Sequence, residues 1–250
     1  MDHRIESIAI HQPNYIPWLG YFFKIFMSDH FVFHDDVLFS AKSFTKRCLI
    51  RKEFNSQETQ WLGVAVLKGG DKKIKAIKID HMSLKIEKHI KKMEYLYHAT
   101  PYYDYYFPTL KSALSEYDQF QNLAEFNIHI IKTLAKLLKI NSHFHKSSDL
   151  DFNLKAHNYN LALIKQFDCS VYYSGTGAKE YQDDILFAEN NIDLVYLDTL
   201  GYLDQNNYLQ HQGDFLPSLS IIDAIMNVGV EGVREIFFAM RQEFNPSQAI

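Results

Sequence analysis

The sequence predicts an α/β protein with a mostly parallel or mixed central sheet, flanking helices and a helical insertion. Three observations lead to this fold class. Residues 5–37 read as strand, loop, helix and strand; residues 83–140 carry a helical pattern; and strand–helix alternation resumes at residue 143. Strands that alternate with helices favour a parallel sheet, because each crossover helix returns the chain to the edge at which the previous strand began.

The first unit contains the loop in which the main candidate functional residues lie. A short apolar strand at residues 5–10 is followed by the loop HQPNYIP, the apolar-periodic helix LGYFFKIFMSD and a second strand, HFVFHDDV, at residues 30–37. In a parallel sheet this loop lies at the carboxyl end of the first strand, the edge where ligands usually bind. We therefore expect functional residues along that edge.

The remaining elements follow in chain order. Strand-like segments occupy residues 47–53, 61–67 and 73–80, and the KGGD turn predicts that the last two form a hairpin. The helical pattern, interrupted by Pro101 and Pro108, predicts a subdomain at about residues 83–140. Alternating strands and helices are then expected at residues 143–150, 155–167, 169–175, 183–190 and 192–198, with closing helices at 220–240. Because no linker or repeat divides the chain, residues 1–250 are expected to form a single domain.

Composition excludes several classes of protein. A hydrophobic content of 47% supports a substantial core, and a net charge of -4 argues against general nucleic-acid binding. The two cysteines, Cys48 and Cys169, show no CxxC spacing, which predicts the reducing cytoplasm. The N-terminus lacks a signal-peptide pattern and Lys24 interrupts the apolar run YFFKIFM, so neither export nor a membrane span is expected.

One segment departs from this acidic average. Residues 68–92 contain nine lysines against three acidic residues, so the Lys68–Lys92 segment is locally basic. It can be the solvated face of a strand and a helix, or a docking surface for an acidic carrier protein or for nucleotide phosphates.

The loop HQPNYIPWLGY gathers the most specialised side chains. His11, Gln12 and Asn14 offer hydrogen-bond donors and acceptors, while two prolines stiffen the backbone. Tyr15 and Trp18 supply aromatic surface, although both can equally be core residues. Because a histidine with a pKa near ~6.5 can accept a proton at neutral pH, His11 is the first catalytic candidate.

Asp35 and Asp36 end the second strand and are expected at the same edge of the sheet as His11. Adjacent strand residues point to opposite faces, so only one of them can readily join His11. A turn-capping role for the pair is the alternative. His30, His34 and Asp36 share a strand face and are suitable metal ligands, but their spacing is not diagnostic and we predict no metal site.

Anion-binding candidates lie in two later segments. Arg47 follows the second strand and can clamp a phosphate or carboxylate with its fork of donors, or simply be solvated. The stretch YYSGTGAKEY places Ser174, Gly175 and Tyr181 after a strand, where backbone amides can cradle an anion. It is neither a GxGxxG fingerprint nor a P-loop, so no dinucleotide or Walker-type nucleotide site is predicted.

Five segments together resemble the WbqC-like family over nearly the whole chain. They are HQPNYIPWLGYF, DHFVFHDDVLFS, WLGVAV, YYSGTGAKEY and FLPSLSIIDAIMNVG. The resemblance marks these positions as family-like: His11, Gln12, Asn14, Tyr15, Trp18, Asp35, Asp36, Ser174, Gly175, Tyr181, Gln210 and Asn227. In KSFTKR this chain departs from the family, which has an aromatic residue followed by an Asn–Arg pair, so the anion contact of Arg47 is in question.

The resemblance implies a place in bacterial O-antigen, lipopolysaccharide or other surface-polysaccharide biosynthesis. It further implies an acyl- or aminoacyltransferase that modifies the amino group of a nucleotide-linked amino sugar. We expect His11 to act as base, Asp36 to orient it, and Gln12 or Asn14 to bind the oxyanion. Arg47 and the SGTG loop would hold the phosphates, and the acyl donor would be an acyl carrier protein or a coenzyme A thioester.

Other functions remain open from sequence. A His-containing loop between the first strand and first helix also occurs in nucleotidyltransferase folds, so an adenylate-forming or nucleotidyl-transfer enzyme is one alternative. A non-catalytic binding or scaffold protein of the same pathway is another. Glycosyl transfer is a weaker possibility, because no isolated DxD motif with a following strand is present to hold a metal and a sugar nucleotide.

Overall fold

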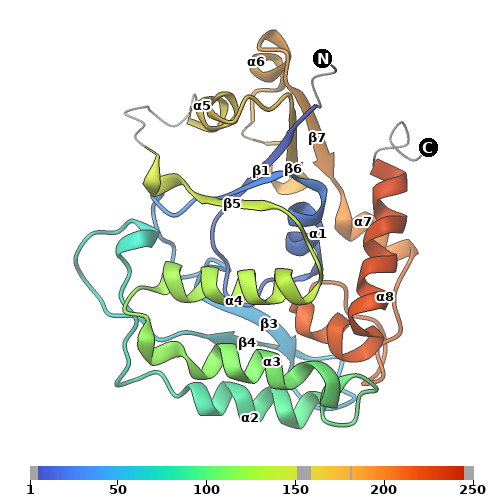
Figure 1. The fold of residues 1–250 in the computed structure, drawn as a ribbon. Coiled ribbons are helices and arrows are strands. Elements are labelled where there is room, and N and C mark those ends of the chain that lie inside the picture. The colour runs from blue at the N-terminus through green and yellow to red at the C-terminus, as the bar shows by residue number, and fades with distance from the viewer. Residues whose placement is uncertain (1–4, 151–158, 181, 245–250) are drawn as a thin grey trace.

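The central sheet of the computed structural model, which describes residues 5–150, 159–180 and 182–244, is parallel (Figure 1). Its strands are β1 (Ser7–His11), β2 (His30–Phe33), β5 (His143–Lys146), β6 (Val171–Gly175) and β7 (Asp193–Leu197). They lie in the order β5-β2-β1-β6-β7, and every pair between them is parallel. The expected α/β fold is confirmed.

The strand order places a reversal at the centre of the sheet. From β1 the chain first builds outward through β2 to β5, then crosses back to the other side of β1 for β6 and β7. The two crossovers that leave the middle of the sheet therefore diverge above the carboxyl ends of β1 and β6. In doubly wound sheets this topological switch point is where ligands bind.

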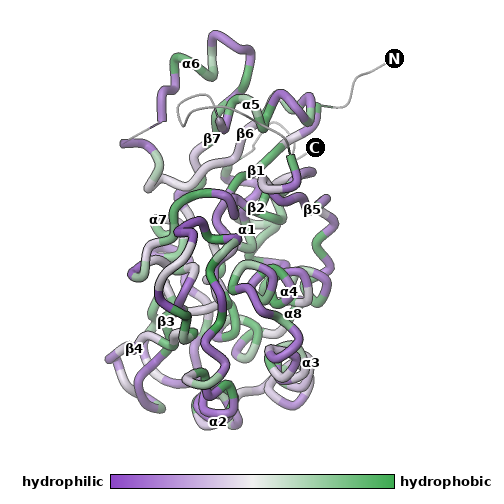
Figure 2. Tube along the Cα trace, turned by 90° about the vertical axis from the view of Figure 1, so that its left-hand side faces the viewer, coloured by the Kyte–Doolittle hydropathy of each residue, from purple (hydrophilic) through white to green (hydrophobic). Residues whose placement is uncertain are grey.

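Helices cover both faces of the sheet because alternate strand residues point to opposite sides. On one face Ile8, Ile10 and Val32 form a core with α5 (Tyr159–Gln166) and α6 (Asp184–Glu189). On the other, Ala9 and Phe31 join a larger core with α1 (Leu19–Met27) and α8 (Ile221–Phe244). Figure 2 shows the hydrophobic residues of β1 and β2 in the middle of the molecule.

The helical insertion is present as predicted. It comprises α2 (Ile86–Tyr97), α3 (Tyr103–Ser115) and α4 (Leu123–Leu137), and α7 (Thr199–Gln205) follows the last strand. Side chains of α2, α3 and α4 belong to the same core as α1 and α8. Pro108 does not separate two helices but lies inside α3 as its sixth residue, where it cannot donate a hydrogen bond to the carbonyl of Asp104.

The predicted hairpin around the KGGD turn is reduced to a short antiparallel pairing: Val66 bridges Ile79, Leu67 N donates to Lys78 O at 3.0 Å, and Asp80 N donates to Ala65 O at 2.9 Å. The antiparallel strand pair consists of β3 (Arg47–Arg51) and β4 (Thr59–Gly63), and residues 73–80 form only the short 3-10 helix Ile74–Ala76 and isolated bridges. The backbone of this segment bonds to several separate partners: the amide of Lys75 donates to Asp35 O, and that of Ile79 donates to Gln121 O. Outside the short pairing with residues 65–67, distant loops thus satisfy the backbone groups of this segment.

Candidate functional site at the switch point

The carboxyl ends of β1 and β6 bring together five residues that we name the switch-point cluster. They are His11, Asn14, Lys24, Ser174 and Gly175. Lys24 comes from α1, whose start faces this edge because the helix follows directly from the loop after β1. Helical side chains lean toward the helix start, so that of Lys24 extends toward the strand ends. A Cβ atom placed on Gly175 would lie 3.7 Å from Lys24 Nζ.

His11 is oriented by the chain beside it. It is partly buried at the end of β1, its ring meets Tyr21 edge-on at 4.7 Å, and its Nδ1 lies 3.1 Å from Gln12 O. A carbonyl oxygen only accepts, so Nδ1 carries the proton and Nε2 keeps its lone pair. Burial and then the charge of Lys24 lower the pKa of His11 to about 3. His11 is therefore neutral at physiological pH, with Nε2 available to accept a hydrogen bond.

Lys24 is the residue that sequence reasoning missed. Its side chain is buried, with 7% of its surface exposed, and burial lowers its pKa to about 8. No hydrogen bond or ion pair joins it to any other residue that the structure describes. From sequence it counted only as an interruption of an apolar run; a single charge within an otherwise buried helix was the available signal.

Asp36 occupies a neighbouring position on the same edge but does not orient His11. Its carboxylate accepts hydrogen bonds from Ser147 Oγ at 2.6 Å and Tyr159 OH at 2.7 Å, and none joins it to His11. Burial alone would raise the pKa of Asp36, but these hydrogen bonds and the nearby His34 outweigh it, so its pKa is lowered. Asp36 therefore remains ionised beside β2 and β5.

His34 is the imidazole that Asp36 approaches. Its Nε2 lies 3.8 Å from Asp36 Oδ1, and its ring stacks on Tyr159 with centroids 5.2 Å apart. Burial lowers the pKa of His34 against the opposing effect of Asp36. Nε2 is buried and, among the described residues, lacks a hydrogen-bond partner. The predicted Asp–His pairing thus involves His34, whereas Gln12 O orients His11.

Asp35 has the turn-forming role that the sequence left open. It is 1% exposed, and its carboxylate accepts from Ser148 N at 2.9 Å and Ser148 Oγ at 2.7 Å. Its own amide donates to Ser147 Oγ at 3.2 Å. These bonds tie the end of β2 to the turn after β5, which fixes the position of the adjacent Asp36.

The four other candidate residues of the HQPNYIPW loop are two polar residues, Gln12 and Asn14, and two structural residues, Tyr15 and Trp18. Gln12 accepts from Thr45 Oγ1 at 3.2 Å, which leaves its amide NH₂ group to donate, and the buried Asn14 side chain has no hydrogen-bond partner among the described residues. Tyr15 is fully buried and bonds His89 Nδ1 at 2.8 Å through its hydroxyl. The Trp18 indole lies directly over Gly20, where a Cβ would clash at 2.5 Å. Tyr15 and Trp18 therefore pack against the protein interior and hold the loop in place.

The predicted anion-binding residues are dispersed. Ser174 is buried at the end of β6 and, in the described chain, makes no side-chain hydrogen bond. Arg47 lies on β3, where it donates to Lys42 O at 2.7 Å and sits 4.0 Å from the centre of a Trp61 ring. Tyr181 lies outside the described residues.

Gln210 and Asn227 belong to a second polar cluster, which we name the Arg51 network. Its members are Arg51, Tyr97, Tyr208, Gln210, Asp223 and Asn227, all buried. Arg51 donates to Gln210 Oε1 and Asp214 O, while Tyr208 OH donates to Asp223 Oδ2 at 2.8 Å. Burial raises the pKa of Asp223 to about 6, against the opposing hydrogen bond from Tyr208 and the charge of Arg51.

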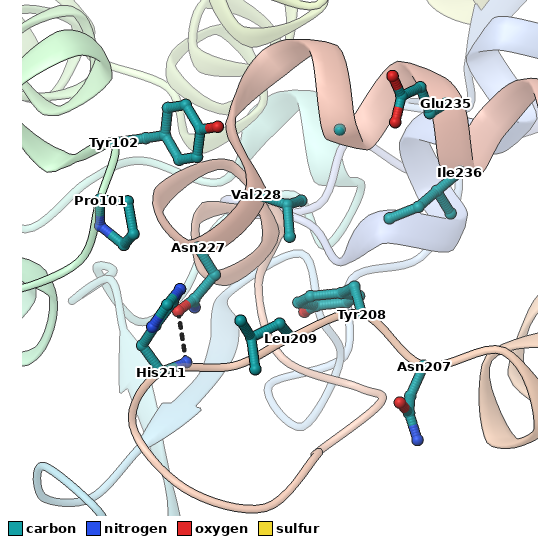
Figure 3. A pocket seen from close by; sticks show the side chains of 11 residues that line it. Pro101, Tyr102, Asn207, Tyr208, Leu209, His211, Asn227, Val228, Glu235 and Ile236 are labelled. Carbon is teal, nitrogen blue, oxygen red and sulfur yellow. Dashed lines mark hydrogen bonds between the residues drawn. The ribbon is translucent and has the colours of Figure 1, made fainter.

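A cavity of about 480 Å³ borders this network (Figure 3). Tyr102, Tyr208 and Val228 line it together with Asn227 and His211. The Asn227 side chain is already committed, because Oδ1 accepts from His211 N at 2.8 Å and Nδ2 donates to Asp223 O at 2.8 Å. The cavity thus shares Asn227 with the predicted site but none of the switch-point cluster.

Potential metal ligands gather at the opposite end of the strands. In the parts of the chain that the structure describes, Glu6, His30 and Cys169 place one ligand atom each within 4.8 Å of one another. His30 is already paired, with Nε2 2.9 Å from Glu6 Oε2 and Nδ1 3.1 Å from His145 Nε2. His30 therefore bonds away from His34 and Asp36, the partners considered for it from sequence.

Comparison with known proteins identifies the family. The model of the WbqC-like protein family matches residues 12–235. The chain belongs to the WbqC-like protein family. The uncharacterized protein Rv1507c of Mycobacterium tuberculosis is 31% identical over 229 residues, which cover 91% of this chain and 96% of that protein. No solved structure matches the chain.

The family match of this WbqC-like chain begins at Gln12, so it includes most of the switch-point cluster, and His11 immediately precedes it. Within the described residues, no helix is both long and apolar enough to traverse a lipid bilayer.

Proposed function

We propose that this WbqC-like protein is an acyl- or aminoacyltransferase that modifies the amino group of a nucleotide-linked amino sugar, in the cytoplasmic steps of bacterial O-antigen or other surface-polysaccharide biosynthesis. The observation that carries the proposal is the state of His11. Its Nδ1 proton is directed at Gln12 O, so Nε2 is a free proton acceptor at the ligand-binding edge of the sheet.

The reaction assigns a step to each polar residue. The amino nitrogen of the sugar attacks the acyl carbonyl carbon of a thioester, a carbon–nitrogen bond forms, and the carbon–sulfur bond breaks. His11 Nε2 accepts the proton that the amine loses and returns it to the departing thiolate. The amide NH₂ groups of Gln12 and Asn14, which make no hydrogen bond in the described structure, are the oxyanion donors.

The donor is an acyl carrier protein or coenzyme A thioester. The Lys68–Lys92 segment supports an acidic carrier, because its lysines 68, 72, 73, 75, 78, 85, 88 and 91 are exposed. A thermal-shift screen against dTDP-, UDP- and GDP-linked amino sugars, followed by an acyl-transfer assay with the sugar that binds, tests the reaction directly. Absence of N-acylated product with every thioester donor would refute it.

Two variants of His11 test its role. H11N keeps a donor near the position of Nδ1 but removes Nε2, and H11A removes both. Both should fold, bind the nucleotide sugar and lose ~10²–10⁴-fold in turnover, the usual range for a general base. The exposed His98, whose Nδ1 contacts Tyr95 O at 3.1 Å, gives the matched control H98N. Full activity of H11N would rule out the proposed mechanism.

One observation favours the second candidate, an adenylate-forming or nucleotidyl-transfer enzyme. A buried lysine beside a histidine at the switch point suits the phosphates of a nucleoside triphosphate as well as those of a sugar nucleotide. Release of pyrophosphate that depends on ATP and an acyl acid distinguishes this reaction from acyl transfer. Tight binding of a nucleotide sugar without turnover of any donor would instead favour a scaffold protein.

A further inference from the structure

Lys24 is a buried cation for which the described chain offers no anion. The two carboxylates at the end of β2 already have partners: Asp35 is bonded by Ser148, and Asp36 by Tyr159. No salt bridge of the described residues includes Lys24. Burial of an ammonium group without a compensating charge costs free energy, so its retention at a ligand-binding edge requires a reason.

Gly175 leaves an approach to this ammonium group. The backbone of Gly175 is extended, with φ -85° and ψ 152°, which any residue can adopt, so glycine is not needed for its conformation. Its missing side chain instead matters for space, because a Cβ would stand 3.7 Å from Lys24 Nζ. Two residues further along, nothing lies within 4 Å of the position of a Cβ on Gly177. Among the described residues beyond its chain neighbours, Lys24 Nζ is the one atom within 4 Å of the Cβ position of Gly175, so the glycine leaves space beside the ammonium group.

We propose that Lys24 is the anchor for a phosphate group of the substrate, held between α1 and the loop after β6 at the switch point. Three features select phosphate. The site is cationic and largely desolvated, it adjoins Gly175 at the end of β6, where no side chain fills the space, and doubly wound sheets bind nucleotides at this place. That the phosphate belongs to a nucleotide-linked sugar rests on the proposed function.

Binding at Lys24 also prepares His11. The charge of Lys24 is one of the causes that hold the pKa of His11 at about 3. A phosphate bound to Lys24 offsets that charge and raises the pKa of His11, which makes Nε2 a stronger base only when substrate is present. Lys24 therefore acts on the reaction through the substrate phosphate and through His11.

The test uses inorganic pyrophosphate and UDP as probes of the full-length protein. Isothermal titration at pH 7 should show binding of both to the wild type and at least a tenfold loss of affinity in K24M. K24R, which keeps the charge, should retain part of the affinity. The exposed Lys165, which bonds only Asn190 at 2.6 Å, provides the control K165M, which should bind as the wild type does. Equal affinity in K24M and wild type would overturn the proposal.

Two further measurements separate phosphate from other roles. Acetate and glycine at the same concentrations should not compete with pyrophosphate; effective competition would show a carboxylate site and overturn the assignment. The carbon resonance of the Lys24 side chain should report a higher pKa with pyrophosphate bound, and no change would contradict direct contact. If K24M is less stable than the wild type, Lys24 is structural and the proposal fails.

The outcome is independent of the acyl-transfer assay. Loss of pyrophosphate binding in K24M, with no acylated product from the wild type, would sustain the phosphate anchor and refute the proposed reaction. Acyl transfer by the wild type, with pyrophosphate affinity unchanged in K24M, would sustain the proposed reaction and refute the phosphate anchor.

Discussion

The switch-point cluster and the Arg51 network are both buried and polar, but the Arg51 network makes many more side-chain hydrogen bonds among the described residues, although Nε of Arg51 has no partner there. In the Arg51 network the guanidinium of Arg51 bonds three oxygens, and Gln210 uses its oxygen and its nitrogen within the network. In the switch-point cluster Lys24 has no partner among the described residues, and the only hydrogen bond of the His11 ring is to the carbonyl of the next residue.

This difference separates a structural role from a functional one. Buried polar groups with complete hydrogen bonds stabilise a particular arrangement, whereas buried groups without partners lower stability and are retained where a ligand will supply the missing partner. Both clusters contain residues that resemblance marked as site residues. The side-chain oxygens and nitrogens of Gln210 and Asn227 all make hydrogen bonds in or beside the Arg51 network, whereas the Asn14 side chain makes no hydrogen bond among the described residues.

Disruption of the Arg51 network should give the largest effect on stability. R51M removes the Arg51 donor from the carbonyls of Ser56 and Asp214 and leaves the buried Gln210 Oε1 with the Leu216 amide alone. We expect a loss of about 3–5 kcal/mol in the free energy of unfolding, the usual cost of removing one partner of a buried charge network. Urea denaturation followed by circular dichroism measures it. A loss below about 1 kcal/mol would show that the network is not structural.

Removal of the Lys24 charge should increase the free energy of unfolding, the opposite of the effect of R51M. Its pKa is about 8 in the folded protein and near 10.5 when unfolded, so charged Lys24 lowers the stability of the folded state at pH 7. K24M should therefore be more stable there by up to about 3 kcal/mol, since a shift of one pKa unit corresponds to about 1.4 kcal/mol. The advantage should shrink as the pH rises from 8 to 10.5, where the unfolded state also loses the proton.

The pH window of this effect provides its control. Stability curves of wild type and K24M, measured by urea denaturation at pH 7, 9 and 10.5, should converge at high pH. K165M should show no such convergence, because Lys165 is exposed. A constant difference between K24M and wild type across this range would mean that packing of the methionine, and not the charge, causes the change.

Protonation of Asp223, within the Arg51 network, should make stability fall with rising pH, whereas Lys24 makes it rise. Its folded pKa of about 6 lies above the ordinary value of 3.8, so the folded state holds this proton more tightly than the unfolded state. Relative to D223N, the wild type should lose about 3 kcal/mol of stability as the pH rises from 4 to 6, and little more above that. Comparison with D223N is needed because His11 contributes with the opposite sign: its lowered pKa makes stability rise between pH 3 and 6.5.

The strands and helices of this fold were largely predictable, and the partners within the site were not. Alternating apolar segments indicated the parallel sheet, because each segment carries its own periodicity. The hairpin at residues 73–80 forms only near the bridge between Val66 and Ile79, because the buried residues Ile74 and Ile77 are three apart, a spacing that does not continue a strand. Strand periodicity cannot reveal that distant loops satisfy the backbone of this segment.

The partners of Asp36 show the same limit for side chains. Ser147 and Tyr159 lie 111 and 123 residues from Asp36 in sequence, so no local pattern connects them. Placing both aspartates at the strand ends was possible from sequence, whereas choosing His34 over His11 as the neighbour of Asp36 required the positions of β5 and α5. Lys24 was overlooked for a related reason: a lysine is ordinarily exposed, and its burial depends on α1 packing beside the end of β6.

The smallest expected effect on stability is that of G175A, which fills space at the switch point without changing a charge. G175A adds a methyl group 3.7 Å from Lys24 Nζ, an ordinary contact distance, at a backbone conformation that alanine adopts without strain. The free energy of unfolding should change by less than about 1 kcal/mol, and an increase is expected because alanine restricts the unfolded chain. Pyrophosphate affinity should nevertheless fall several-fold, because the methyl group occupies the side from which the phosphate reaches the ammonium group. G177A, which adds its methyl group to open space, should keep both stability and affinity. If G175A and G177A bind pyrophosphate equally well, the phosphate reaches Lys24 from another side, and Gly175 does not shape the site.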